Sequence, residues 1–199
     1  MGSETAKSLA AGDSVLLLID YQARKFYGVE SHGRTGIKNN VMALAQGASI
    51  LGIPTVLTTM QAGRSGPFMP EIVAMFPGIS AFDRKSINVF DETDVREAVK
   101  STGRKQLVIS GLWTSICVCL PALEGIRSGY DVFAVVDAGG SESLDSHNTA
   151  VMRMVQAGVV PCTWMQVVSE WMNSWANPKA GELYAKVFKT YSGFFGQTQ

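Results

Sequence analysis

The sequence predicts an α/β fold: a doubly wound three-layer sandwich around a mostly parallel sheet of about six strands. Two observations indicate this fold. Near-continuous apolar runs recur along the chain, as expected for strands that are buried on both faces. Segments with helical spacing, each followed by Gly or Pro, separate these runs. Strand and helix therefore alternate over nearly the whole length, which is typical of parallel strands joined by crossover helices.

Five strands are predicted from apolar runs that turn residues bound on either side. They are Val15–Ile19, Thr55–Thr58, Gln106–Ser110, Val132–Val136 and Val159–Trp164. None is long enough to cross a bilayer. Their lack of polar alternation indicates a sheet that helices cover on both faces.

Four helices are predicted between or after these strands. The first carries an apolar stripe within 41–51 and ends at Gly52 and Pro54. The other three are each followed by a glycine, as expected for a helix C-cap. They are Asp91–Val99, Ser115–Arg127 and Ala150–Gln156.

The length of 199 residues, with 46% hydrophobic and 17% charged residues, suits one globular domain over residues 1–199. Within it, residues 1–11 are small and polar and are expected to be flexible. Residues 165–199 are expected to form a C-terminal helical segment with oligomer contacts. Gln61–Pro70, with two Gly and two Pro, is expected to be a loop near a site or an interface. An aromatic and Met-rich stripe is expected to pack in the core or against another subunit: Trp164, Met165, Trp171, Met172 and Trp175.

The charge balance argues against two classes of partner. Lys and Arg together number 17, as do Asp and Glu, so no global field favours nucleic acid or an anionic membrane. The three cysteines do not make a disulfide framework, which favours a reducing compartment. The first residues contain no apolar segment typical of a secretory signal. We therefore expect a cytoplasmic protein with neither nucleic-acid nor membrane partners.

Three kinds of reactive side chain fall near strand ends, where open α/β sheets place their sites. Asp20 directly follows the first apolar run, Arg84 and Lys85 precede 87–90, and Cys117 enters the helix after the third run. A helix N-terminus lowers a thiol pKa, and a carboxylate, a cation and a thiol together suit nucleophilic acyl transfer. Taken singly, each has a structural alternative: a turn-forming aspartate, a solvated cation pair and a small core cysteine.

The segments around these residues resemble the motifs of isochorismatase-like cysteine hydrolases. The similar segments are 111–118 (GLWTSICV), 129–132 (GYDV), 136–138 (VDA) and 18–22 (LIDYQ). Further segments are similar to the YcaC-like branch of that family, among them 38–41, 54–59 and 105–107. The resemblance covers roughly residues 14 to 164 and implies an isochorismatase-like, Rossmann-like fold.

The resemblance also implies a catalytic triad of Asp20, a cation and Cys117. Family members usually carry a lysine six positions before the phenylalanine that matches Phe90, and here that position is Arg84. The neighbouring Lys85 is the alternative cation. An arginine stays charged at any working pH, so if Arg84 holds the position, proton transfer falls to Asp20 alone.

A further implication of the resemblance concerns the turn before the cysteine. The family has a non-proline cis peptide bond just before the threonine, here Leu112–Trp113. Backbone N–H groups of this turn and of the cysteine would then stabilise an oxyanion. The expected oxyanion and cis-peptide residues are Leu112, Trp113, Thr114 and Cys117.

The activity implied by the resemblance is cysteine-dependent hydrolysis of a small molecule. Because Cys117 is present, cleavage of a C–N bond in an amide or imide through a thioester is favoured, as in an amidohydrolase. An apolar wall for a small, partly hydrophobic amide is expected from Phe26, Phe68, Trp113 and Ile116. Two alternatives stay open: hydrolysis of another bond, as in true isochorismatases, and a catalytically silent ligand-binding or assembly protein.

No cofactor is expected, and the sequence argues against a metal site. Family nicotinamidases hold a metal through an aspartate and several histidines after the second strand, but 59–70 contains neither residue type here. Relatives in the YcaC-like branch form rings that stack, so the resemblance implies a homo-oligomer, either a tetramer or an octamer.

Overall fold

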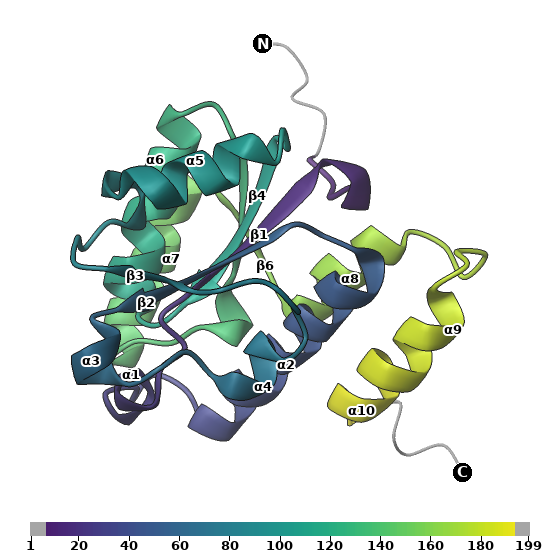
Figure 1. Cartoon of the computed structure of the whole chain (residues 1–199), viewed down its shortest axis with the longest axis horizontal. Coiled ribbons are helices and arrows are strands. Elements are labelled where there is room, and N and C mark those ends of the chain that lie inside the picture. The colour runs from purple at the N-terminus through teal and green to yellow at the C-terminus, as the bar shows by residue number, and fades with distance from the viewer. Residues whose placement is uncertain (1–6, 194–199) are drawn as a thin grey trace.

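One sheet of six parallel strands forms the centre of the molecule (Figure 1). The computed structural model describes residues 7–193. The strand order is β3-β2-β1-β4-β5-β6, with every neighbouring pair parallel, and it confirms the predicted fold class. The strands are β1 (Ser14–Ile19), β2 (Thr55–Met60), β3 (Phe82–Arg84), β4 (Gln106–Gly111), β5 (Asp131–Val135) and β6 (Val160–Cys162).

The central strands β1 and β4 are buried along their whole length, as their apolar sequences predict. Strand β3 has no counterpart among the predicted strands. It holds three residues, one of them the exposed Asp83, and it lies at an edge of the sheet, so no apolar run marks it. The last strand is shorter than predicted, because the chain turns into a helix at Trp164.

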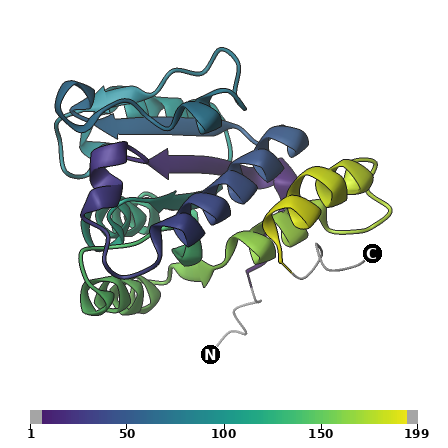
Figure 2. The same ribbon diagram turned by 90° about the horizontal axis from the view of Figure 1, so that it is seen from below.

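Helices cover both faces of the sheet (Figures 1 and 2). One face packs against α2 (Arg34–Leu51) and α8 (Trp164–Met172). The other packs against α5 (Thr93–Ser101), α6 (Cys119–Arg127) and α7 (Leu144–Gln156). The remaining helices are short: α1 (Ala23–Tyr27), α3 (Ala62–Ser65), α4 (Pro70–Val73), α9 (Ala180–Leu183) and α10 (Lys189–Tyr191).

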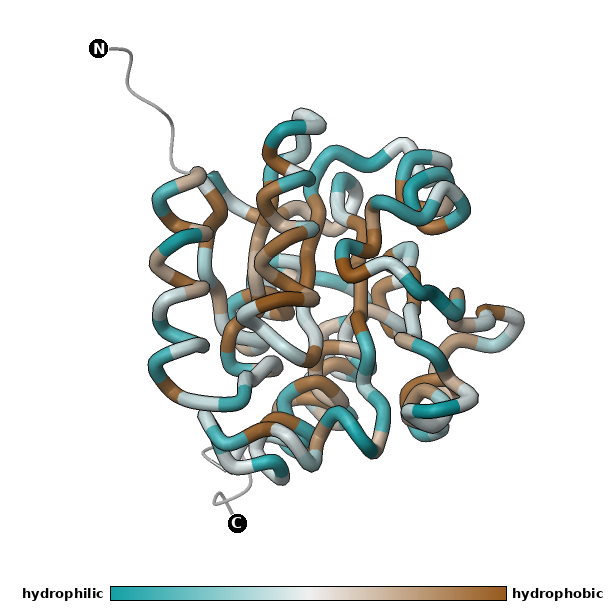
Figure 3. The backbone as a smooth tube through the Cα atoms, turned by 90° about the vertical axis from the view of Figure 1, so that its left-hand side faces the viewer, coloured by the Kyte–Doolittle hydropathy of each residue, from teal (hydrophilic) through white to brown (hydrophobic). Residues whose placement is uncertain are grey.

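Buried apolar side chains form two clusters, one on each face of the sheet. Figure 3 shows strongly hydrophobic residues concentrated in the central strands between these helix layers. In the C-terminal aromatic stripe, Trp164 and Trp171 are buried, and the Trp171 indole donates to Ser14 Oγ at 2.9 Å. Trp175 is 63% exposed. The stripe therefore packs in the core at its start and reaches solvent at its end.

The predicted helix at Ser115–Arg127 is divided into a π-helical turn, Thr114–Val118, and α6. Pro121 lacks a backbone N–H, so it cannot donate to the carbonyl of Cys117 as a regular α-helix would require. This wider turn contains Cys117 and follows the carboxyl end of β4 at Gly111. This local irregularity positions the candidate nucleophile.

Expectations were also made for the two chain ends and for the loop at Gln61–Pro70, and the structure describes these segments to different extents. Of the segment expected to be flexible, residues 1–6 lie outside the described residues, whereas Leu9 is buried and its N–H donates to Glu170. In the C-terminal segment α8 ends at Met172, residues 173–179 are not helical, and helical structure continues from Ala180 to Tyr191. Gln61–Pro70 contains the helical turn α3. No helix within residues 7–193 has the length and apolar character that crossing a membrane requires.

Candidate active site

Asp20, Arg84 and Cys117 lie at or after the carboxyl ends of three parallel strands, at one edge of the sheet. Asp20 follows β1, Arg84 ends β3, and Cys117 lies in the turn after β4. The strand order reverses between β1 and β4, and this switch point is where open α/β sheets bind their ligands.

Arg84 and Asp20 form a buried ion pair. Arg84 Nη2 donates to Asp20 Oδ2 at 2.6 Å, and both side chains are 0% exposed. The other terminal nitrogen of the guanidinium donates to the carbonyls of Ser86 and Ile87, which fixes its orientation. Lys85 is exposed. Arg84 is therefore the cation beside Asp20, and Lys85 is not.

Asp20 has an unusual backbone conformation and a raised pKa. Its φ of 58° is left-handed, a conformation that aspartate tolerates better than most residues, and its N–H donates to the carbonyl of Thr58 at 2.9 Å. Burial raises the pKa of Asp20 to about 6, although Arg84, the nearby Cys117 thiol and Lys25 each lower it. Asp20 is therefore ionised at neutral pH and has the basicity of a general base.

Cys117 is 6% exposed, and its thiol is not activated in the way that its position at a helix start predicts. Burial and the negative charge of Asp20 raise the pKa of Cys117, and the opposing effect of Arg84 is smaller. The expectation of a lowered thiol pKa is therefore wrong. At neutral pH the pair therefore consists of a carboxylate beside a neutral thiol.

Three buried polar atoms at these strand ends lack a hydrogen-bond partner. They are Asp20 Oδ1, Thr58 Oγ1 and Arg84 Nε, and no other buried side-chain nitrogen or oxygen in residues 7–193 shares this property. Such an atom costs about 1–3 kcal/mol when it stays unpaired, so its presence calls for an explanation. Two of the three side chains, Asp20 and Arg84, interact with the Cys117 thiol, so these atoms gather around the sulfur. Thr58 was not among the predicted site residues, although its hydroxyl interrupts an apolar strand.

The turn that precedes Cys117 contains the expected cis peptide bond, Leu112–Trp113. Its N–H groups are not equally available to an oxyanion. Leu112 donates to the carbonyl of Ile19, and Thr114 donates to that of Gly140. The Trp113 N–H has no backbone acceptor among the bonds of this turn and instead donates to the Cys117 sulfur, which lowers the pKa of that thiol. Of the expected oxyanion residues, Leu112 and Thr114 therefore hold the turn in place, while the Trp113 N–H faces the Cys117 sulfur.

The buried side chain of His147 contacts this turn at Thr114. The Nδ1 atom of His147 lies 3.1 Å from Thr114 Oγ1, and the ring meets that of His32 edge-on, with 4.5 Å between centroids. Burial and the neighbouring His32 lower the pKa of His147 to about 4. This contact was not predicted, because His147 and Thr114 are far apart in the chain and on different elements.

The low pKa of His147 predicts a pH-dependent loss of stability. The unfolded chain binds a proton at His147 below about pH 6.5, whereas the folded chain does so only near pH 4, so this residue lowers stability as the pH falls through that window. We expect His147→Leu to lose less of its free energy of unfolding between pH 7 and pH 5 than the wild type, as measured by urea denaturation. Thr114→Val removes the same contact but keeps the imidazole, and it should retain the wild-type slope. Equal slopes in all three proteins would contradict this account.

The four residues expected to form an apolar wall lie in different settings. Phe68 is 4% exposed and packs edge-to-face against Tyr21 at 6.0 Å, so it backs the wall without offering a surface. Phe26 lines a cavity of about 490 Å³ at the α1 end of α2. Ile116, beside Cys117, is 38% exposed. The Trp113 indole donates to the carbonyl of Lys25 at 3.0 Å and so joins the turn to α1.

Gly28 makes room for the indole of Trp113. A Cβ atom at this glycine would overlap the six-membered ring of the indole. We expect Gly28→Ala to cost about 1–3 kcal/mol of stability through this overlap and to displace the indole. Thermal unfolding and tryptophan fluorescence measure the two effects. Gly33→Ala serves as the control, because its Cβ would meet no atom within 4 Å.

Within residues 7–193, no three side chains of His, Cys, Asp or Glu gather as potential metal ligands. The three cysteines are free thiols.

Comparison with known proteins shows which family this chain resembles. Residues 14–166 match the isochorismatase domain model. The chain is 40% identical over 175 residues to the probable hydrolase YcaC of Escherichia coli K12, covering 87% of this chain and 84% of that protein.

Two solved structures superpose closely on the chain. YcaC from Pseudomonas aeruginosa, solved with hexane-2,5-diol and covalent acrylamide, gives a TM-score of 0.93 at 36% identity and covers 98% of this chain and 96% of that one. The YcaC gene product from Escherichia coli, an octameric hydrolase of unknown specificity, also gives 0.93, at 37% identity, and covers 98% and 95%. This chain belongs to the isochorismatase family.

Proposed function

We propose that this protein is a cysteine hydrolase that cleaves the C–N bond of a small amide or imide. One observation carries the proposal: the Asp20 carboxylate is paired with Arg84 and also interacts with the Cys117 thiol by a side-chain hydrogen bond. A base with a pKa of about 6 beside a neutral thiol suits proton transfer at neutral pH.

In the proposed reaction, Asp20 takes the thiol proton while Cys117 Sγ attacks the carbonyl carbon. The N–H groups of Trp113 and Cys117 stabilise the oxyanion, each contributing about 3 kcal/mol if it resembles other oxyanion-hole donors. The C–N bond then breaks, and the leaving nitrogen receives the proton from Asp20. A water molecule next attacks the thioester and gives one proton to Asp20, which returns it to the departing sulfur.

Arg84 has a fixed role in this scheme. Its guanidinium cannot release a proton, so it holds the Asp20 carboxylate and favours the negative charge that forms on sulfur. Phe26, Trp113 and Ile116 are proposed to face the apolar part of the substrate.

The direct test is an activity screen on small amides, imides and ureas with three proteins. The wild type is expected to hydrolyse at least one of them, and Cys117→Ala is expected to abolish that turnover. Cys119→Ala is the matched control, because Cys119 is also buried but lies in α6 and is expected to have no role. Full turnover by Cys117→Ala would refute the mechanism.

Acrylamide provides a second test that needs no substrate, since a relative was solved with acrylamide bound covalently. We expect it to label Cys117 faster than Cys119 or Cys162, as followed by peptide mass spectrometry. If all three react alike and no amide is hydrolysed, the alternative of a silent ligand-binding or assembly protein is favoured.

We also propose that the protein forms a homo-oligomer, a tetramer or an octamer, in the cytoplasm. The octameric assembly of the Escherichia coli relative supports the first part, and the free thiols support a reducing compartment. Exposed apolar side chains on α7, namely Leu144, Met152 and Val155, are candidates for subunit contacts. Light scattering on the purified protein would measure the mass.

A further inference from the structure

Lys25 places a positive charge beside the triad, and the proposed reaction gives this charge no role. The residue is half-buried and lies in α1, the short helix that begins just after Asp20. Its Nζ atom lies over the indole of Trp113, 5.6 Å from the ring centroid, which is within the range of a cation–π contact. Trp113 also directs its backbone N–H at the Cys117 sulfur. The ammonium and the candidate nucleophile are therefore both neighbours of the same residue.

The backbone of Lys25 is held by contacts at both ends of α1. The Trp113 indole donates to the carbonyl of Lys25 at 3.0 Å, and Gly28, which follows the helix, leaves room for the indole ring. Before the helix, the side-chain oxygen of the buried Gln22 accepts from the N–H of Met60 at 2.9 Å. Helix α1 is thus attached to the end of β2 and to the turn before Cys117, and Lys25 starts from a fixed position.

The positive charge of Lys25 acts on the triad and is not cancelled there. Burial raises the pKa of Asp20, and Lys25 is, with Arg84, among the groups that lower it, so its charge is felt at the buried carboxylate. Asp20 and Arg84 already balance each other in their ion pair, and the Cys117 thiol is neutral at neutral pH. Among these four groups, Lys25 therefore supplies the one unbalanced charge.

The ammonium of Lys25 also has hydrogen-bond donors to offer. Within residues 7–193 it forms no ion pair with a carboxylate, whereas Lys38, on α2, pairs with Glu71 at 2.8 Å. The face of an indole attracts a positive charge but accepts no strong hydrogen bond, so the N–H groups of the ammonium remain available. A ligand that brings a negative charge to this point would meet both an unbalanced charge and free donors.

We infer that Lys25 makes this site selective for an anionic substrate, namely a small amide or imide that also carries a carboxylate. The inference rests on the proposed hydrolase function and adds the substrate class to it. A carboxylate matches a single ammonium in charge and accepts short, charge-assisted hydrogen bonds from it. In the bound substrate, the carboxylate meets Lys25, the carbon chain lies against the Trp113 indole, and the scissile carbonyl carbon faces the Cys117 sulfur.

The test compares two alkylating reagents of nearly the same shape, iodoacetate and iodoacetamide, of which only the first is charged. With either reagent a bond forms between the Cys117 sulfur and the CH2 carbon, the C–I bond breaks, and iodide and the thiol proton leave. We expect Lys25→Gln to lower the ratio of the iodoacetate rate to the iodoacetamide rate at Cys117 about tenfold, because it removes one charge-assisted contact. Peptide mass spectrometry at low salt measures both rates. The ratio reports charge recognition alone, since a change in the basicity of Asp20 alters both rates equally.

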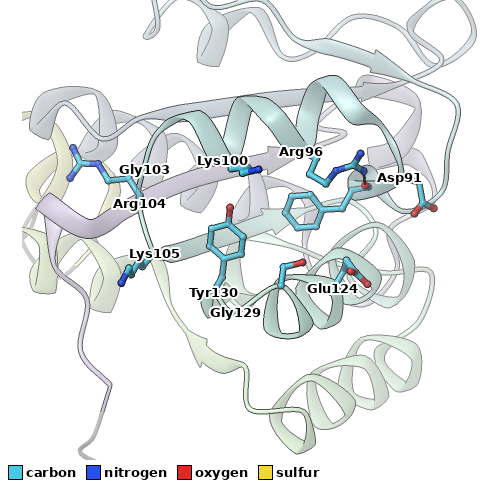
Figure 4. Close-up of a pocket in the computed structure, with 11 residues that line it drawn as sticks. Asp91, Arg96, Lys100, Gly103, Arg104, Lys105, Glu124, Gly129 and Tyr130 are labelled. Atoms are coloured by element: carbon cyan, nitrogen blue, oxygen red, sulfur yellow. Dashed lines mark hydrogen bonds between the residues drawn. The ribbon is translucent and has the colours of Figure 1, made fainter.

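Two further variants serve as controls for this measurement. Lys25→Arg keeps the positive charge and should keep most of the wild-type ratio. Lys100→Gln should leave the ratio unchanged, because Lys100 lies on α5 and lines a separate cavity of about 720 Å³ that no triad residue lines (Figure 4). The inference is wrong if Lys25→Gln has the wild-type ratio, if Lys25→Arg loses the ratio as fully as Lys25→Gln does, or if Lys100→Gln lowers it as much.

Turnover provides a second measurement. Succinamic acid carries an amide and a carboxylate, and succinamide has a second amide in place of that carboxylate. Where the activity screen finds hydrolysis, compounds with a carboxylate should have the higher kcat/KM, and Lys25→Gln should lose this preference mainly through a higher KM. Turnover confined to neutral amides would overturn the inference. If no compound is hydrolysed, the proposed function fails, and the alkylation ratio still decides whether Lys25 recognises an anion.

Discussion

Asp20→Asn is expected to slow acrylamide labelling of Cys117 at pH 7 by between about a hundredfold and ten-thousandfold, the range of general base catalysis. The amide has nearly the shape of the carboxylate but cannot accept the thiol proton. In the wild type the labelling rate should rise with pH through about 6, because Asp20 must be ionised before it can act as a base. The variant should lack this rise in labelling rate near pH 6. It should react only at pH values at which the Cys117 thiol ionises without the help of a base.

Asp137→Asn is the matched control for this experiment. Burial also raises the pKa of Asp137 to about 6, but this carboxylate accepts from the N–H of Trp164 at 2.9 Å and takes no part in the proposed chemistry. Its loss should lower stability and leave the labelling step near pH 6 in place. If the rise in labelling rate near pH 6 persists in Asp20→Asn, or disappears in Asp137→Asn, a group other than Asp20 accepts the proton of the Cys117 thiol.

The sequence was sufficient for the fold class and for naming the candidate site residues. Apolar runs identify strands that are buried on both faces, and Asp20 and Cys117 each follow such a run. Strand β3 escaped prediction because an edge strand of three residues has no apolar run to mark it. Arg84 lies on that strand, and for this reason the choice between Arg84 and Lys85 needed coordinates.

Features that depend on contacts between distant segments could not be predicted. The raised pKa of Cys117 results from burial and from a carboxylate nearly a hundred residues earlier, whereas the sequence offered only a position near a helix start. His147 supports the turn through a hydroxyl on another element. In the sequence Thr58 looks like any other strand residue. Only the structure shows that its buried hydroxyl has no hydrogen-bond partner.

Arg84→Met is expected to have the largest effect on stability, about 3–5 kcal/mol, because it leaves the buried Asp20 carboxylate without its cation. The remaining charge can be removed by protonation, so the pKa of Asp20 should rise above its wild-type value of about 6. The labelling step of Cys117 should then move to higher pH by the same amount. Urea denaturation measures the first effect and the pH dependence of acrylamide labelling the second.

Two further variants separate charge from geometry at this position. Arg84→Lys keeps the positive charge but has one nitrogen in place of the fork that contacts both Asp20 and the carbonyls of Ser86 and Ile87. Its stability and its labelling step should lie between those of the wild type and of Arg84→Met. The double variant Asp20→Asn with Arg84→Met contains no unpaired buried charge, so it should regain much of the stability lost in Arg84→Met without regaining fast labelling.

Arg34→Met is the control for the loss of an arginine, because the Arg34–Glu30 pair is exposed and should contribute no more than about 1 kcal/mol. If Arg84→Met were as stable as Arg34→Met and labelled Cys117 with an unshifted pH step, the buried pair would have no part in activating the thiol. Asp20 would then obtain its basicity from burial alone. A loss of stability with an unshifted step would instead limit Arg84 to a structural role, since protonation of Asp20 links the two measurements.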